Sequence, residues 1–70
     1  MGVIKMRTTL INRRKELGLS QVDVAKRLGV DKSHYCNIEK GKRGISLDIA
    51  YQLSKILKIK FAYENFKSEE

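Results

Sequence analysis

The chain has 70 residues, a mass of 8.1 kDa, 41% hydrophobic residues and a net charge of +7. This length allows one small domain and excludes a catalytic domain beside a substrate domain, while the apolar content is enough for a core and too high for a disordered chain. A single cysteine excludes an internal disulfide, and the sequence has neither a bilayer-spanning apolar run nor a secretory leader. We therefore expect a reduced, cytoplasmic protein with no membrane attachment.

The positive charge is confined to the first part of the chain. Residues 1–43 carry 11 basic and 4 acidic side chains, whereas residues 44–70 carry 4 of each and are neutral. A basic excess segregated in this way is typical of proteins that bind a polyanion, either a nucleic acid or an acidic membrane surface. The alternative is a solvated basic face with no partner.

Apolar residues recur at helical spacing throughout the chain, and no stretch alternates for long as a strand would. The pattern therefore predicts an all-α fold made of short helices. In chain order, Thr8 or Thr9 is expected to cap a first helix, which Gly18 ends.

The next two helices have clear start and stop signals. Ser20, with Asp23 three residues on, predicts a capping box at the start of a second helix, and Gly29 ends it. Asp31 is expected to cap a third helix that runs to about Lys40. Both helices have only about two turns, too short to be stable alone, so they must pack on each other.

The remainder of the chain predicts a loop, a fourth helix and a tail. Residues 41–44, with the sequence GKRG, form a flexible basic loop, and Ser46 caps a helix that ends near Leu57. A short fifth helix is expected within an apolar, aromatic tail that contains Ile59, Phe61, Tyr63 and Phe66.

Residues 20–40 have the form of a helix-turn-helix, because a tight glycine turn joins two short helices of which the second is polar on one face. The small side chain of Ala25 allows the two helices to cross closely. The segments SQVDVAKRLGV (20–30) and NIEKGKR (37–43) resemble the phage repressor and Cro helix-turn-helix family. The similarity extends upstream through RRKELGL (13–19) and downstream from Ser46 to Leu57, so it covers about 50 of the 70 residues.

This resemblance implies a compact, lambda repressor-like bundle of five helices that binds duplex DNA as a dimer. It places Lys32, Ser33 and Asn37 at positions that face base edges in the major groove. Lys can donate to guanine O6 and N7, and Asn can pair with adenine through two hydrogen bonds. For Lys32 the alternative is a contact with phosphate only. His34 lies where it can reach a base or a phosphate, and the alternative for it is a solvated side chain with no special role.

The remaining DNA-binding positions implied by the resemblance contact phosphates. Gln21 matches a glutamine whose amide touches a phosphate while bracing a recognition side chain, although an exposed helix residue is the alternative. Lys40, Lys42 and Arg43, at the end of the third helix and in the loop after it, are placed to meet phosphates, which position the protein without specifying sequence.

Other matched positions are structural. The resemblance implies an ion pair between Arg14 and Glu39. Tyr35 departs from the family pattern of Val, Ile or Leu, so we expect its ring in the core and its hydroxyl emerging near the DNA backbone. Lys58 stands where many relatives have glycine, which leaves the geometry of that helix end open. His34 and Cys36 are too few ligands for a zinc site, and an unreactive cysteine is expected over a redox switch.

A single two-turn helix contacts too few base pairs to select one site in a genome, and dimerisation is the usual remedy. The neutral tail can supply a self-complementary interface through Ile59, Phe61, Tyr63 and Phe66, although these residues can instead close the monomer's own core. We therefore expect one domain with a core at about residues 8–59 and a dimerisation segment at residues 59–66.

The sequence predicts a DNA-binding transcriptional regulator, a repressor in the first instance, that occupies a palindromic operator as a homodimer. The alternative is an antitoxin or a protein-interaction module that uses the same bundle to hold a partner protein. An enzyme is not expected, because no nucleophile has an adjacent base and no carboxylate pair is evident. No cofactor or metal is expected.

Overall fold

The computed structural model of the chain describes residues 6–66, and the side chains of residues 63 and 64 lie outside this description. Within that range the regular elements are five helices: α1 (Thr8–Glu16), α2 (Gln21–Leu28), α3 (Lys32–Glu39), α4 (Leu47–Leu57) and α5 (Tyr63–Phe66). This agrees with the all-α fold of five short helices expected from the sequence. Across residues 6–66, none of these helices has the length and apolarity needed to cross a membrane.

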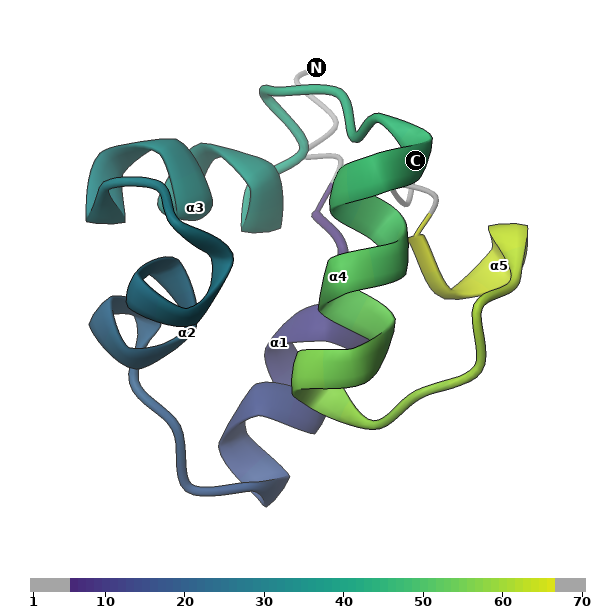
Figure 1. The fold of residues 1–70 in the computed structure, drawn as a ribbon, viewed down its shortest axis with the longest axis horizontal. Helices are drawn as coiled ribbons and strands as arrows, with labels where there is room; N and C mark the ends of the chain where they lie inside the picture. The colour runs from purple at the N-terminus through teal and green to yellow at the C-terminus, as the bar shows by residue number, and fades with distance from the viewer. Residues whose placement is uncertain (1–5, 67–70) are drawn as a thin grey trace, which may run out of the picture.

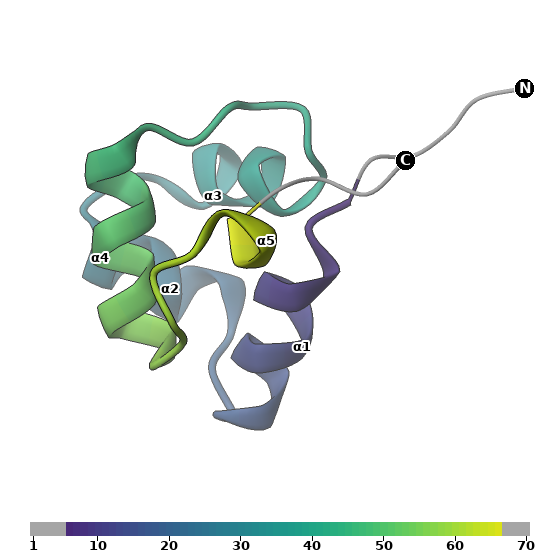
Figure 2. The same ribbon diagram turned by 90° about the vertical axis from the view of Figure 1, so that its right-hand side faces the viewer.

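The helices pack around one centre. Figure 1 shows α2 and α3 side by side at the left, α4 across the middle with α1 behind it, and α5 on the far side of α4 from α3. After a quarter turn, α5 lies between α4 and α1 (Figure 2). The α2–α3 pair therefore forms one edge of the molecule, and α1, α4 and α5 support it from behind.

The capping box predicted for α2 is present. The Asp23 backbone N–H donates to Ser20 Oγ at 3.0 Å, and the Ser20 N–H donates to Asp23 Oδ2 at 2.9 Å. Gly29 ends α2 with a φ of 83°, a left-handed conformation that glycine adopts without steric cost. Both ends of α2 are thus determined by residues within the helix-turn-helix segment itself.

The caps predicted for α3 and α4 are confirmed as well. Asp31 Oδ1 accepts from the backbone N–H of His34 at 2.7 Å, and Ser46 Oγ accepts from that of Ile49 at 3.2 Å. Each cap satisfies one of the N–H groups that the first turn of a helix leaves without an intrahelical partner. Sequence signals three residues apart therefore set where these helices begin.

The start of α1 differs from the prediction that Thr8 or Thr9 caps it. Arg7 occupies the N-cap position, makes no side-chain cap hydrogen bond, and accepts from Leu10 and Ile11 through its carbonyl. The prediction was wrong because the Arg7 side chain points into the protein, where it donates hydrogen bonds to carbonyls of other elements. Arg7, rather than a threonine, therefore stands at the start of the helix.

Lys58 takes up the backbone conformation of the glycine found in many relatives. It follows α4 with φ 56° and ψ 48°, in the left-handed region, and is the only non-glycine residue with positive φ among residues 6–66. The next residue, Ile59, donates its N–H to Ser54 O at 3.0 Å. The helix end is therefore retained, at the steric cost of a side chain in a left-handed conformation.

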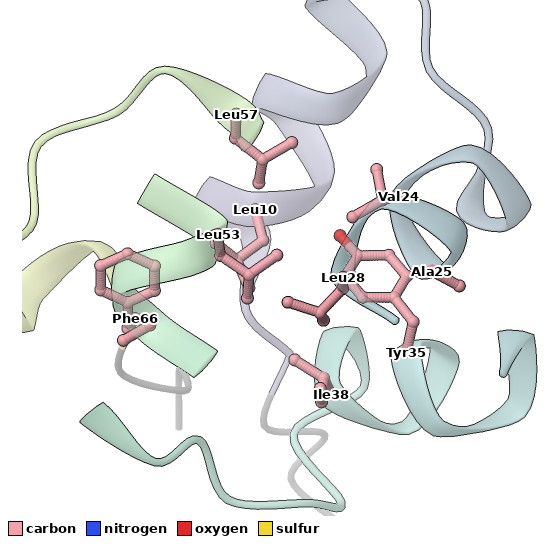
Figure 3. Packing of buried hydrophobic residues seen from close by; sticks show 10 residues of the cluster. Leu10, Val24, Ala25, Leu28, Tyr35, Ile38, Leu53, Leu57 and Phe66 are labelled. Atoms are coloured by element: carbon pink, nitrogen blue, oxygen red, sulfur yellow. The ribbon is translucent and has the colours of Figure 1, made fainter. Parts of the chain in front are cut away.

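All five helices contribute to a single apolar core. Figure 3 shows the Tyr35 ring among side chains of α2, with Leu10, Leu53 and Leu57 at the contact between α1 and α4. The buried apolar residues are Leu10, Val24, Ala25, Leu28, Tyr35, Ile38, Ala50, Leu53, Leu57 and Phe66. Because α2 and α3 each place several residues in this core, their position is maintained by the packing of the whole domain.

Candidate nucleic-acid interface

The turn between α2 and α3 is closed by backbone hydrogen bonds. The N–H groups of Gly29 and Val30 both donate to Ala25 O, at 2.9 and 3.0 Å. Ala25 is only 2% exposed, in keeping with the small side chain expected where the two helices cross. A helix of two turns has little stability alone. The position of α3 therefore depends on this turn and on the packing of α3 in the shared core.

One side of α3 faces the core and the other faces solvent. Tyr35, Ile38 and Glu39 are buried, whereas Lys32, Ser33 and Lys40 are exposed. At roughly 100° per residue, four of the five predicted DNA-binding side chains of α3 and its C-cap fall within an arc of about 140° on the side away from the core. Those four residues are Lys32, Ser33, Asn37 and Lys40, and we call this surface the exposed arc.

Asn37 and His34 lie at the edge of that surface and are half-buried. Helical geometry places Asn37 on the exposed arc and His34 about 60° beyond it. The structure thus brings together Lys32, Ser33, Asn37 and Lys40, and leaves His34 at the margin.

The basic loop after α3 folds back on the end of that helix. The N–H groups of Lys42 and Arg43 both donate to the carbonyl of Asn37, at 3.0 and 3.2 Å. Gly41 permits the reversal with a φ of 76°. Both basic side chains are exposed next to the end of α3, which extends the positive surface beyond the helix.

A buried ion pair joins α1 to the last turn of α3. Arg14 donates to both carboxylate oxygens of Glu39, from Nε to Oε2 at 2.6 Å and from Nη2 to Oε1 at 3.3 Å. Burial by itself would raise the pKa of Glu39, but hydrogen bonds from Arg14 and Gln21 outweigh it and leave the pKa below its ordinary value. The ion pair implied by the family resemblance is therefore present.

Gln21 braces α3 at two points one turn apart. Its Nε2 donates to Glu39 Oε1 at 3.0 Å, and its Oε1 accepts from Cys36 Sγ at 3.0 Å. The bracing role implied for Gln21 is thus directed at the helix that carries the exposed arc. The Cys36 contact is an addition that the sequence analysis did not anticipate.

Tyr35 differs from the expectation that its hydroxyl emerges near the DNA backbone. The side chain is fully buried, and its hydroxyl has no partner at hydrogen-bond geometry among residues 6–66. Burial raises the pKa of Tyr35, and the nearby Glu39 carboxylate raises it further. The expectation was wrong because the ring points across the core toward the Arg14–Glu39 pair rather than along α3 to its surface.

No signal in the sequence pointed to Arg7, which is 7% exposed. Its guanidinium donates to three carbonyl oxygens, from Nη1 to Ile38 at 2.6 Å and to Arg43 at 2.7 Å, and from Nε to Phe66 at 2.7 Å. Its backbone N–H also donates to Glu39 O, at 2.8 Å. No residue type near it in sequence signals these contacts, because every acceptor is a backbone carbonyl at least 31 residues away.

The four residues predicted for a dimer interface have different surroundings. Phe66 is 8% exposed and completes the monomer's own core, and Ile59 packs partly buried against that core. Phe61 is 50% exposed. The side chain of Tyr63 lies outside the described part of the structure.

Two further apolar residues lie exposed on α4. Leu47 is 81% and Tyr51 48% exposed, one helical turn apart. The Tyr51 ring meets the Phe61 ring edge to face with centroids 5.7 Å apart, and Lys55 Nζ lies 4.5 Å from the Tyr51 centroid. We call the surface made by Leu47, Tyr51 and Phe61 the α4 patch.

Comparisons with known proteins agree with this geometry. A protein-family model described as helix-turn-helix matches residues 10–63. In structure, the chain is similar to the restriction-modification controller protein C.AhdI from Aeromonas hydrophila, with a TM-score of 0.74, 33% identity and 86% coverage of each chain.

The chain is also similar in sequence to uncharacterised HTH-type transcriptional regulators. One from Methanothermobacter thermautotrophicus is 40% identical over 52 residues, which cover 74% of this chain and 75% of the relative. One from Archaeoglobus fulgidus is 34% identical over 55 residues, which cover 79% of this chain and 78% of the relative. Both relatives are described as transcriptional regulators, the class of protein expected from the sequence. The chain belongs to the helix-turn-helix family of DNA-binding transcriptional regulators, of the phage repressor and Cro type.

Proposed function

We propose that this chain represses transcription by binding a palindromic duplex operator as a homodimer, with α3 in the major groove. The observation that carries this proposal is the exposed arc, a polar and basic surface on a helix whose opposite side is locked into the core. A major groove about 12 Å wide admits one α-helix, and half-sites one helical turn apart suit a symmetric dimer.

Within this proposal, base recognition falls to Lys32, Ser33 and Asn37. Lys32 stands in the first turn of α3, the end of a recognition helix that approaches the base edges, and is free to donate to guanine. Asn37 supplies an amide that suits adenine, and Ser33 can donate to or accept from any base. His34, at the margin of the exposed arc, contacts a base edge or the adjacent phosphate.

Phosphate contacts fall to Lys40, Lys42 and Arg43, with a lesser part for Gln21. Gln21 uses one Nε2 proton on Glu39, so its second amide proton remains for a phosphate. The folded-back loop places Lys42 and Arg43 beside the end of α3, where they flank a groove that holds the helix. These contacts supply affinity and register rather than sequence preference.

The homodimer is proposed to form through the α4 patch, together with the partly buried Ile59, two residues before Phe61 in the chain. Leu47, Tyr51 and Phe61 expose apolar surface on a part of the chain that carries no net charge, so two copies can approach with less repulsion than through the basic residues 1–43. Phe66 supports this surface from beneath, since its ring lies 6.3 Å from that of Phe61. The similarity to a restriction-modification controller supports a role as a small transcriptional controller.

Affinity selection of random duplex DNA at two salt concentrations tests this function. An enriched inverted repeat, retained at the higher salt, is expected. Lys32→Ala should lose part of that preference, whereas Lys15→Ala, which removes an exposed charge on α1, serves as the matched control and should select the same repeat.

A second candidate is a protein-interaction module or antitoxin, which the exposed apolar α4 patch favours as a docking surface. In that case selection would enrich no sequence, and binding would vanish at moderate salt as the non-specific phosphate contacts are screened.

A further inference from the structure

Arg7 joins three parts of the chain that are distant in sequence. The carbonyl of Ile38 belongs to the last turn of α3, that of Arg43 to the basic loop, and that of Phe66 to the end of α5. Figure 2 shows the segment that leads into α1 running past the loop after α3 and past α5. Carbonyls at the C-terminal end of a helix carry partial negative charge, so α3 offers a favourable site for this buried cation.

The basic loop depends on few contacts for its position. It has a glycine at each end, and a Cβ added at Gly44 would meet no atom within 4 Å, so the first packing contact after the loop is that of Ile45 with the core. The backbone of Arg43 is held through both of its polar groups, because its N–H donates to Asn37 O and its carbonyl accepts from Arg7 Nη1. The position of the Arg43 backbone, from which the exposed side chain projects, therefore depends in part on Arg7.

We propose that Arg7 is a positioning residue for DNA binding, which holds Arg43 against phosphate and couples that contact to the docking of the C-terminal segment. This inference rests on the proposed phosphate contact of Arg43. The same guanidinium binds the loop through Nη1 and α5 through Nε, so a displacement of Phe66 changes the support of Arg43 within one protomer. Binding of DNA and order at the end of α5 are then linked within a single protomer through the Arg7 guanidinium.

The test uses Arg7→Lys, which keeps the charge but has one ammonium group in place of a planar fork and cannot reach three carbonyls together. The probe is a mixed-sequence duplex of about 12 base pairs, roughly one helical turn, on which one protomer binds without its partner. Affinity is measured across a range of salt concentrations for the natural chain, Arg7→Lys, Arg43→Ala and the double variant.

Loss of one phosphate contact lowers the salt slope by about 0.9, so the drop in affinity from 50 to 200 mM salt becomes about 3- to 4-fold smaller. We expect Arg43→Ala and Arg7→Lys each to show this change, and the double variant to show no more than either. Arg13→Lys is the matched control, since Arg13 donates to the carbonyl of Leu57 at the end of α4, away from the loop. It should lower stability and leave the salt slope unaltered.

An unchanged slope for Arg7→Lys, or additive effects in the double variant, would overturn the coupling and leave the DNA-binding function intact. An unchanged salt slope for Arg43→Ala would instead show that Arg43 does not contact phosphate, and the proposed coupling would then be wrong as well. A measurement on the unsubstituted protein covers the case in which Arg7→Lys does not fold. On addition of the duplex, the carbonyl NMR signals of Arg43 and Phe66 should shift together, and a stationary Phe66 signal would contradict the coupling.

Discussion

The guanidinium of Arg14 and the carboxylate of Glu39 meet through two hydrogen bonds, which connect the last turn of α1 to the last turn of α3. Glu39 is 2% exposed, so its replacement by Gln leaves the Arg14 charge without its anionic partner and turns one acceptor oxygen into an NH2 donor. We expect Glu39→Gln to lower the free energy of unfolding by about 3 kcal/mol, in the range for breaking one side of a buried pair. Urea titration at neutral pH measures it.

The control for this prediction is Glu16→Gln, which breaks the exposed pair between Arg13 and Glu16. Exposed pairs contribute less than about 1 kcal/mol, so this variant should unfold close to the natural chain. An equal decrease in the free energy of unfolding for the two substitutions would show that the buried Arg14–Glu39 pair stabilises the fold no more than an exposed pair.

The same carboxylate predicts how stability responds to acid. The pKa of Glu39 in the folded protein lies below its ordinary value of 4.5, so on acidification the unfolded chain takes up the proton first. The stabilisation by Glu39 is fully present above its ordinary pKa and is lost as the pH falls through the folded-state value. Thermal unfolding between pH 7 and pH 3 should show this loss in the natural chain, and the difference from Glu39→Gln should shrink toward pH 3.

Lys58→Gly is expected to stabilise the domain. The substitution removes the steric cost of a side chain at φ 56°, roughly 1–2 kcal/mol. The greater freedom of glycine in the unfolded chain opposes this gain by about 0.5–1 kcal/mol. The net gain should be about 0.5–1 kcal/mol, seen as a rise of several degrees in Tm. Lys60→Gly, at a position with ordinary φ, should lower Tm, and a fall for both would mean that Lys58 is not strained.

Lys32→Ala and Arg43→Ala should affect different properties of DNA binding, the first base preference and the second overall affinity. We expect Lys32→Ala to relax base preference at one position in each half-site, at a cost of about 1–3 kcal/mol for the preferred base. Arg43→Ala should weaken binding on all sequences alike. Selection of random duplexes by each variant measures this, and uniform weakening by Lys32→Ala would assign Lys32 to phosphate.

Substitutions in the tail separate assembly from folding. Phe61→Glu should weaken self-association in sedimentation equilibrium while the monomer stays folded, because Phe61 is half exposed in the α4 patch. Phe66→Ala should instead destabilise the fold by about 3–5 kcal/mol, since it empties a core position. Unchanged assembly of Phe61→Glu would contradict the proposed interface.

The sequence predicted those features that depend on residues close together in the chain. The caps at Ser20, Asp31 and Ser46 each involve a partner three residues away, and the left-handed turn at Gly29 follows from one residue type. The family resemblance supplied the Arg14–Glu39 pair, which no local pattern reveals.

The missed features depend on how distant segments meet. The carbonyls that accept from Arg7 belong to Ile38, Arg43 and Phe66. Every residue has a backbone carbonyl, so the residue types in a sequence do not indicate which carbonyl will accept. The family pattern predicted a buried Tyr35 ring, but the expectation that its hydroxyl emerges near the DNA backbone was wrong, because the packing of the ring in the core places the hydroxyl. Phe66 was compatible with a core or with an interface, and only the packing of α5 against α1 and α4 decided for the core.

The division of α3 into two sides has a consequence for how regulators of this kind diversify. Tyr35, Ile38 and Glu39 hold the helix in place, while Lys32 and Ser33 project away from the protein. Substitutions on the outer side, where we propose the base contacts, leave the buried contacts of α3 intact. In the proposed mode of binding, the residues that contact DNA and the residues that hold the helix are therefore separate sets that can vary independently.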